Sequence, residues 1–343
     1  MSGLRVAVVG ATGAVGQNLL SQLESRRFPA GEIVAFASER SAGRRVAGRA
    51  VHALHEDAIE GFDLALFSAG GTVAGQWAPK FASRGTVVVD NSSRWRMNDD
   101  VPLVVAEVNP EALDAHRGIV ANPNCTIMQA LLVLKPLLDA AGLERVILSS
   151  YQSVSGTGMK AVEELKAQAR AILAGEEPPA PQVYPHHIAF NVLPQVETFK
   201  DGDDYTTEER KTVDESRKIL GVPDLPLSAT CARVPVLVCH SEALNVQTRD
   251  ELSPDECREV LAAAPNVIVE DDPAAGRYPL ARNVAGRDEV FVGRIRRDPS
   301  HPRALNLWVV GDNLRKGAAT NAVQVAELLV ERGLVRGGTA RAA

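Results

Sequence analysis

Cys125 is the residue best placed for covalent chemistry in this sequence. It follows Asn122, Pro123 and Asn124, which favour a helix start, and apolar residues at helical spacing come after it. The pattern therefore predicts a helix that begins at Cys125. Unpaired N–H groups and the helix dipole would favour the reactive thiolate there and stabilise an oxyanion on an acyl group bound to sulfur. A buried structural cysteine is the alternative.

Arg233 and His240 are a second pair with chemical potential. They lie seven positions apart in ATCARVPVLVCHSE. On one straight strand they would face opposite sides, about 23 Å apart. They can share a site only if the chain bends between them, and Pro235 is where we expect the bend, because proline is excluded from central strands. A structural histidine at a strand end is the alternative.

The glycine turn GATGAVG, residues 10–16, indicates a site for a dinucleotide. An apolar run, residues 4–9, precedes it, and a helical segment, residues 17–24, follows. Strand, glycine turn and helix in this order place backbone N–H groups against a pyrophosphate. The spacing is GxxGxxG, a variant of GxGxxG, and a tight turn without function is the alternative. The residues expected to bind the cofactor here are Gly10, Thr12, Gly13, Ala14 and Val15.

The second strand, residues 32–37, leads into a polar turn that bears on the choice of cofactor. Glu39 would suit the ribose hydroxyls of NAD. Ser38, Arg40 and Ser41 are better suited to a 2′-phosphate, so we expect NADP. A solvated, positively charged turn is the alternative.

Buried strands and helices alternate through the first third of the chain, which predicts a doubly wound parallel sheet. Such sheets bind ligands at the carboxyl ends of their strands. Ser68 and Gly70 are therefore expected near the cofactor and Arg96 near an anion, although Arg96 would also fit an exposed surface. The further strands are predicted at residues 63–68, 86–90, 101–105 and 119–121.

The pattern changes after residue 145, which indicates a second domain. A strand there leads into a Gly/Ser loop, residues 153–158, and a helix. Glu208 and Lys211 lie on one face of a charged helix, with a surface ion pair as the default interpretation. A last helix, residues 320–331, is expected to dock on the dinucleotide sheet with Asn313 near the cofactor, before a frayed tail at 337–343. The predicted division is 1–130 for NADP binding, 131–310 for catalysis and dimerisation, and 311–343 for the C-terminal helix.

Composition limits the class of protein. The 343 residues are 45% hydrophobic and 23% charged, with a net charge of −6, which argues against a nucleic-acid partner. Four cysteines without CxxC spacing argue against a disulfide framework or zinc site and for a reducing, cytoplasmic compartment. His186 and His187 lack the spacing of metal ligands. We expect no membrane segment and no targeting peptide.

Taken together, the motifs resemble those of the bacterial aspartate-semialdehyde dehydrogenase family along nearly the whole chain. The resemblance implies an α/β fold with an N-terminal Rossmann-type domain, a second α+β catalytic and dimerisation domain, and a cytoplasmic homodimer. Arg94 and Trp95 are a local difference. The motifs, in order, are GATGAVG, SERSAG, FSAGG, DNSSRWR, NPNCTIMQ, SYQSVSGTG, EERK, RVPV…CHSEA and DNLRKGAA.

The resemblance also implies a role for individual residues. Cys125 would be the nucleophile, His240 the acid or base, and Gln152 the residue that orients the substrate. Arg233 would bind the substrate carboxylate, with Glu208 near the amino group. The remaining implied contacts are Arg96 and Lys211 with phosphate, Asn124 with substrate, and Ser155, Gly156 and Asn313 with cofactor.

The implied reaction is the NADPH-dependent reductive dephosphorylation of L-aspartyl-4-phosphate to L-aspartate-4-semialdehyde through a thioester on Cys125. It belongs to lysine, threonine, methionine and diaminopimelate biosynthesis. One alternative is an enzyme like N-acetyl-glutamyl-phosphate reductase, although that family usually has glycine where Asn124 precedes the cysteine. The other is a dinucleotide-binding protein without catalytic activity.

Overall fold

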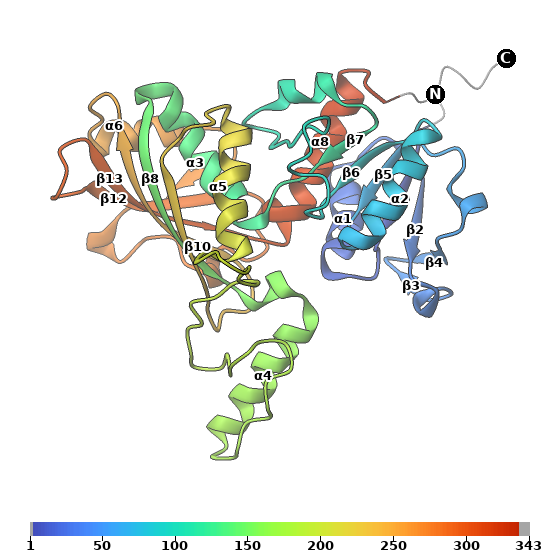
Figure 1. Cartoon of the computed structure of the whole chain (residues 1–343), viewed down its shortest axis with the longest axis horizontal. Coiled ribbons are helices and arrows are strands. Elements are labelled where there is room, and N and C mark those ends of the chain that lie inside the picture. Colours follow the sequence, from blue (N-terminus) through green and yellow to red (C-terminus); the bar gives the residue numbers. More distant parts are fainter. Residues whose placement is uncertain (1–2, 336–343) are drawn as a thin grey trace. The chain divides into compact units, whose positions relative to one another are not determined.

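The computed structural model describes residues 3–335 and divides the chain into two compact units (Figure 1). Unit 1 contains residues 1–124 and 318–343, and unit 2 contains residues 125–317. The chain thus crosses between the units after Asn124 and after Gly317, whereas the sequence predicts boundaries at 130 and 310. The tail predicted at 337–343 lies outside the described residues.

Within residues 3–335, unit 1 is built on a seven-stranded sheet in the order β3-β4-β2-β1-β5-β6-β7. β1 lies between β2 and β5 and is parallel to both, so the strand order reverses at β1. A short antiparallel pair, β3 and β4, forms one edge. The strands are β1 (Leu4–Val9), β2 (Ala30–Ala37), β3 (Arg45–Val46), β4 (Arg49–Ala53), β5 (Leu64–Phe67), β6 (Val87–Asp90) and β7 (Ile119–Ala121).

Helices cover both faces of this sheet, as a doubly wound fold requires. α1 (Ala14–Ser25) and α8 (Thr320–Glu331) pack on one face in a core with Val6 and Val8. α2 (Gly71–Ser83) packs on the other face in a second core with Phe67 and Phe81. The last helix of the chain therefore belongs to the core of the first unit (Figure 1).

The strand predicted at residues 101–105 is wrong. Of this segment, Leu103 alone forms a single bridge, to Ala121. Two backbone hydrogen bonds join the segment to the end of β7, from the Val104 N–H to the Ala121 carbonyl and from the Ala121 N–H to the Pro102 carbonyl. Side chains bind other backbone groups of the segment. Asn109 Oδ1 accepts from the Val105 N–H and Asn109 Nδ2 donates to the Leu103 carbonyl, each at 2.9 Å. Asn321 Nδ2 of α8 donates to the Val104 carbonyl, so the apolar run is buried without joining the sheet as a strand.

Unit 2 is built, within the described residues, on a six-stranded mixed sheet in the order β11-β12-β13-β10-β8-β9. β8 and β9 are parallel, and β10 is antiparallel to both β8 and β13. The strands are β8 (Leu143–Gln152), β9 (Leu227–Arg233), β10 (His240–Thr248), β11 (Val267–Val269), β12 (Val290–Arg297) and β13 (Ala304–Gly311).

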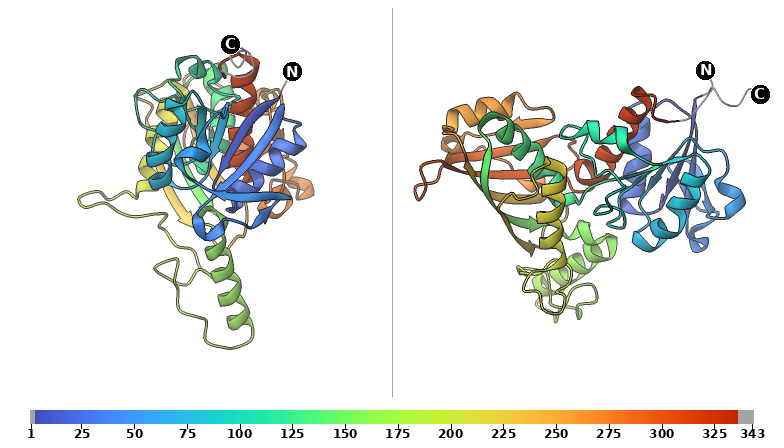
Figure 2. Two further views of the ribbon diagram at one scale, coloured as in Figure 1. Left: turned by 90° about the vertical axis from the view of Figure 1, so that its right-hand side faces the viewer. Right: turned by 45° about the horizontal axis from the view of Figure 1, so that its top comes forward.

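Helix α3 (Cys125–Ala141) packs on the unit 2 sheet and against α5 (Thr207–Leu220) and α6 (Pro254–Ala262). α3 is apolar nearly all round, as its central place requires. α7 (Ala281–Val284) is a single turn, and α4 (Met159–Leu173) extends away from the sheet (Figure 2). Among residues 3–335, no helix combines the length and hydrophobicity needed to cross a bilayer.

Candidate active site

Cys125 is the first residue of α3, where the sequence predicts a helix to begin. Its Sγ lies 3.4 Å from Nε2 of His240, which is the first residue of β10. Of the four cysteines, all within the described residues, Cys125 is the partly exposed one. Burial raises the pKa of the Cys231 and Cys257 thiols to about 12 and raises the pKa of the Cys239 thiol as well. Cys125 is therefore the thiol that a substrate can reach.

Gln152, Arg233 and His240 gather at the ends of three neighbouring strands. Gln152 ends β8 and lies beside Arg233, the last residue of β9, in parallel register. β10 begins with His240 and pairs with β8 from the next residue on. Every second residue of these strands is buried, and all three side chains belong to the buried set. The chain bends between Arg233 and His240, so the two residues come from different strands and meet on one face.

The backbone of Ser153 orients the side chains of His240 and Arg233. Its N–H donates to His240 Nδ1 at 3.0 Å, and its carbonyl accepts from Arg233 Nη1 at 2.8 Å. Because a backbone N–H can only donate, Nδ1 is an acceptor, and the neutral ring carries its proton on Nε2. Burial, followed by the charge of Arg233, lowers the pKa of His240 to about 3. At neutral pH the imidazole is thus uncharged and presents Nε2–H to the Cys125 sulfur.

Cys239 and Asn313 support the turn that precedes His240. Cys239 has a left-handed φ of 76°, a conformation that costs a non-glycine residue about 1–2 kcal/mol. Its N–H donates to Asn313 Oδ1 at 3.0 Å, and the same oxygen accepts from Ser153 and Ser155. Asn313 therefore joins the Gly/Ser loop to the turn before His240, while its contact with a cofactor stays a prediction.

The Arg233 guanidinium is buried but incompletely paired. The residue is 5% exposed, and its Nε has no hydrogen-bond partner among the described residues. A Cβ on Gly156 would lie 3.2 Å from both Arg233 Nη1 and His240 Cε1, so glycine at this position leaves space between the two side chains. A buried cation with an unused donor fits an anionic ligand, because unsatisfied buried groups are rare and costly.

Glu208 is a buried carboxylate in the same unit. Its Oε1 accepts from Gln152 Nε2 and from Thr126 Oγ1, each at 3.1 Å. A capping box formed by Thr206 and Glu209 fixes this first turn of α5. Lys211 Nζ lies 4.0 Å from Glu208 Oε2 and makes a closer ion pair with Glu197 at 2.5 Å. Lys211 is therefore a partly exposed cation one turn beyond Glu208.

The predicted phosphate ligand Arg96 lies in unit 1, whereas Lys211 lies in unit 2. Arg96 is buried behind the end of β6, where Nε donates to the Asn122 carbonyl at 3.0 Å and Nη2 to the Asn91 carbonyl at 2.8 Å. Two carbonyls thus fix the plane of its guanidinium. Asn124, also buried, is the last residue of unit 1 before Cys125.

The glycine turn of unit 1 has the close contacts that a pyrophosphate turn needs. Gly10 has a φ of +88°, and a Cβ there would lie 2.2 Å from the Ser68 carbonyl oxygen. A Cβ on Gly16 would lie 2.1 Å from the Gly10 carbonyl oxygen. Gly13 precedes α1 without a side-chain cap, and the first turn of α1 has no acidic residue among those described. These features fit an anion at the helix N-terminus.

The other predicted cofactor residues of unit 1 lie on loops after strands. Thr12, Ala14 and Val15 belong to the glycine turn and the first turn of α1, while Ser68 and Gly70 follow β5. Ser38 precedes the single helical turn Glu39–Ser41, which follows β2. Ser38, Glu39 and Arg40 are exposed. An acid and a base thus share the loop, and the choice between NADP and NAD stays a prediction.

Four residues of unit 2 escape an analysis of sequence alone. Ser153 contacts His240, and Thr126 contacts Glu208. The other two, Gln129 and Glu242, bind each other. Glu242 alone of the four could have been found from a local pattern, in which polar residues stand at alternate positions at the end of an otherwise apolar strand. Ser150 with Gln152 and His240 with Glu242 both follow it.

Comparison with known proteins agrees with the two units. Residues 5–116 match the family described as "Semialdehyde dehydrogenase, NAD binding domain", and residues 134–316 match "Semialdehyde dehydrogenase, dimerisation domain". Fold and site thus define a two-domain semialdehyde dehydrogenase with a nicotinamide dinucleotide domain.

Relatives along the whole chain define the family more closely. An aspartate-semialdehyde dehydrogenase of Aquifex aeolicus is 53% identical over 97% of this chain and 100% of its own length. A relative of the same name from Legionella pneumophila is 49% identical over 97% of each chain. The crystal structure of the Vibrio cholerae enzyme II complexed with ASA has a TM-score of 0.92 at 43% identity and covers 96% of this chain and 99% of its own. The chain belongs to the aspartate-semialdehyde dehydrogenase family.

Proposed function

We propose that this chain catalyses the NADPH-dependent reductive dephosphorylation of L-aspartyl-4-phosphate to L-aspartate-4-semialdehyde. The observation that carries the proposal is the reachable Cys125 thiol 3.4 Å from His240 Nε2, in a unit that also buries the incompletely paired Arg233. The names of the relatives support the choice of substrate. The reaction is a step toward lysine, threonine, methionine and diaminopimelate, and the free cysteines agree with a cytoplasmic location.

In the first half-reaction, the Cys125 thiolate attacks the carbonyl carbon of the acyl phosphate. A carbon–sulfur bond forms, and the carbon–oxygen bond to phosphate breaks as phosphate leaves with the electron pair. His240 stabilises the thiolate through Nε2–H, because its Nδ1 already accepts the Ser153 N–H. Arg96 and Lys211 offset the charge of the departing phosphate.

In the second half-reaction, the thioester on Cys125 becomes the aldehyde. A bound nicotinamide cofactor would supply the hydride that reduces the thioester carbon. His240 donates a hydrogen bond from Nε2–H to the oxygen that becomes negative, and the N–H groups at the start of α3 stabilise the same charge. When the carbon–sulfur bond breaks, the aldehyde leaves and Cys125 returns to the thiolate.

Substrate recognition rests on charge complementarity within unit 2. Arg233 holds the α-carboxylate, with its unused Nε as one donor of a two-bond contact. Glu208 faces the amino group, Gln152 orients the reacting carbonyl, and Asn124 adds a polar contact. Fixing the non-reacting end of the substrate positions the carbon that Cys125 attacks.

We assign NADP as the cofactor because Ser38, Arg40 and Ser41 follow β2, where a 2′-phosphate would lie. A structure of the Candida albicans enzyme was determined with NADP, at 25% identity and a TM-score of 0.75. Ser155, Gly156 and Asn313 complete the proposed cofactor contacts from unit 2.

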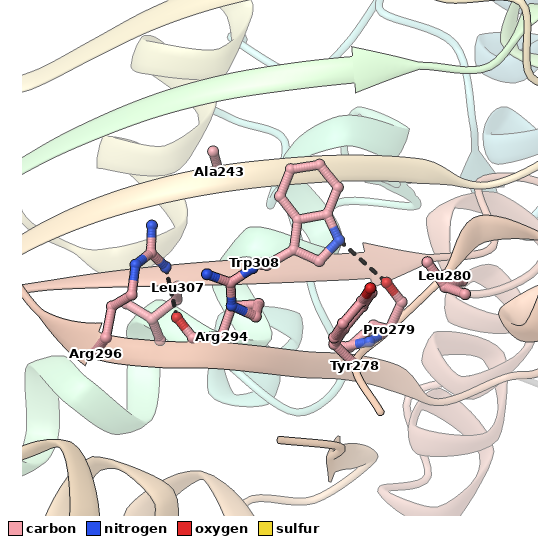
Figure 3. Close-up of a pocket in the computed structure, with 8 residues that line it drawn as sticks. All are labelled: Ala243, Tyr278, Pro279, Leu280, Arg294, Arg296, Leu307 and Trp308. Carbon is pink, nitrogen blue, oxygen red and sulfur yellow. Dashed lines mark hydrogen bonds between the residues drawn. The ribbon is translucent and has the colours of Figure 1, made fainter. Parts of the chain in front are cut away.

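We also propose a homodimer that forms through unit 2, whose matching family is described as a dimerisation domain. The sheet face away from α3 carries an open cavity of about 300 Å³ (Figure 3). Trp308 packs against Tyr151 with ring centroids 5.5 Å apart and the rings tilted by 43°, and Leu280 is 45% exposed. Light scattering tests this proposal: Trp308→Glu should halve the mass of the wild-type particle, and an unchanged dimer would remove this face from the interface.

The function is tested by phosphate- and NADP-dependent oxidation of L-aspartate-4-semialdehyde, which is the reverse reaction. We expect turnover with this aldehyde and none with N-acetyl-glutamate semialdehyde, because Glu208 has no free amino group to bind in the acetylated compound. Preference for the acetylated aldehyde would favour the N-acetyl-glutamyl-phosphate reductase alternative. Cofactor binding without turnover on either aldehyde would favour the non-catalytic one.

A further inference from the structure

A second polar pair joins α3 to β10 beneath the Cys125–His240 pair. Gln129 Nε2 donates to Glu242 Oε1 at 2.9 Å, and the two residues are 2% and 0% exposed. Gln129 lies four residues beyond Cys125 on the helix, a rise of about 6 Å. Glu242 lies two residues beyond His240 on the strand, a rise of about 6.7 Å. The distance between the two pairs is therefore nearly the same along α3 as along β10, so both pairs can form at once.

The sheet is shaped to receive the Gln129 side chain. Gly311 of β13 lies opposite His240, and Glu242 lies between Val309 of β13 and Ser150 of β8. A Cβ on Gly311 would lie 2.4 Å from Gln129 Oε1. The absence of a side chain at position 311 is thus what lets the Gln129 amide approach the sheet.

Glu242 is suited to a neutral rather than an ionic contact. Its Oε2 has no hydrogen-bond partner among the described residues. Burial raises the pKa of the Glu242 carboxyl well above its usual range, although the bond from Gln129 acts in the opposite direction. A protonated carboxyl needs no counter-ion, and it still offers Oε1 as an acceptor to Gln129.

We propose that the Gln129–Glu242 pair is a positioning element that fixes α3 on β10 in the register that holds Cys125 Sγ opposite His240 Nε2. Apolar contacts are not directional and tolerate small shifts of a helix, whereas a buried hydrogen bond is lost when the helix slides. The inference rests on the proposed function of Cys125 and His240, and it adds two residues that touch neither substrate nor cofactor.

The test compares Glu242→Leu, which removes the acceptor at similar volume, with Glu242→Gln, which keeps a neutral acceptor. The control is Val246→Ala, a buried position farther along β10 on the same face. The readouts are kcat, KM and the pH dependence of Cys125 alkylation by iodoacetamide, followed by peptide mass spectrometry. We expect Glu242→Leu to lower kcat about 10- to 100-fold, the scale for misplaced reacting groups, with KM nearly unchanged and the alkylation profile shifted.

Glu242→Gln should stay within about threefold of wild type in kcat, and Val246→Ala should keep the wild-type alkylation profile although it lowers the melting temperature. Gly311→Ala changes neither residue of the pair, but its new Cβ displaces the Gln129 side chain, so it should reproduce the alkylation shift of Glu242→Leu. If Glu242→Leu does not fold, Gly311→Ala still tests the proposal.

The inference would be overturned if Glu242→Leu and Gly311→Ala both kept the alkylation profile and the kcat of the wild type. It would also be overturned if Glu242→Gln were as impaired as Glu242→Leu. Alkylation separates this result from the proposed function. A wild-type protein without turnover on aspartate semialdehyde, combined with a shifted profile in Glu242→Leu, would refute the function and leave the positioning role intact.

Discussion

Replacing Arg233 with lysine tests whether the buried guanidinium binds the substrate carboxylate. The positive charge is kept, but two features of the structure are lost. The donor Nη1 no longer reaches the Ser153 carbonyl at 2.8 Å, and the unused Nε is removed. A lysine ammonium is a point charge and cannot form two parallel hydrogen bonds with a carboxylate.

The size of the effect follows from the loss of one charge-assisted hydrogen bond, which contributes about 1.5–3 kcal/mol. Since 1.4 kcal/mol corresponds to a factor of ten, KM for aspartate semialdehyde should rise about 10- to 140-fold. The value of kcat should fall as well, because the Ser153 backbone that loses its Arg233 contact also orients His240.

The assay is the initial rate of NADPH formation at varied aspartate semialdehyde, with phosphate and NADP saturating. Arg217→Lys is a matched control, because the Arg217 guanidinium also donates to a backbone carbonyl, that of Leu225. Arg217 lies in the last turn of α5, at the opposite end of that helix from Glu208. The KM values for phosphate and NADP should not change in either variant. An unchanged KM for the aldehyde in Arg233→Lys would show that Arg233 does not hold the substrate carboxylate.

Three further outcomes are expected. Cys125→Ser should lose nearly all turnover and still bind NADP in a calorimetric titration, since an alcohol is a poor nucleophile without its own base; substantial turnover would remove Cys125 from the nucleophile role. Arg40→Ala should raise KM for NADPH about 5- to 10-fold, the scale for an exposed charge-assisted bond, and leave KM for NADH unchanged, whereas equal effects on both would contradict the 2′-phosphate assignment. Because the pKa of His240 is lowered to about 3 in the folded state, the unfolded chain takes up its proton first on acidification, so stability falls as pH drops below about 6.5. Between pH 7 and pH 5 the wild type should lose about 2 kcal/mol more than His240→Gln in urea unfolding, and equal losses would show that the native ring titrates normally.

Local features of this chain were readable from its sequence because each depends on neighbours within one turn or strand. The glycine turn and the start of α3 at Cys125 are of this kind. The failure at residues 101–105 has the opposite cause. Asn321, more than 200 positions away, binds the Val104 carbonyl, and the segment makes a single bridge with β7 instead of the continuous pairing that an apolar run leads one to expect.

The sequence was enough to name the residues of the candidate site, but it could not predict how they are arranged in space. Sequence spacing could say only that Arg233 and His240 need a bend between them. Their place on one face depends on the register of β8 with β9 and β10, which pairs residues about 80 to 100 positions apart. The alternation of polar residues in β10 could have marked Glu242, but its partner Gln129 depends on the place of Gly311 in β13, which no local pattern reveals.

The discontinuity of unit 1 has a consequence for the order in which the protein is made. Unit 2 is one uninterrupted stretch, whereas unit 1 needs α8, near the end of the chain, to cover one face of its sheet. During synthesis on the ribosome, the stretch that carries Cys125 is therefore complete before the dinucleotide fold can close. A nascent chain that stops before residue 320 would expose the apolar sheet face that α8 covers in the finished protein, and that face would be a binding site for chaperones.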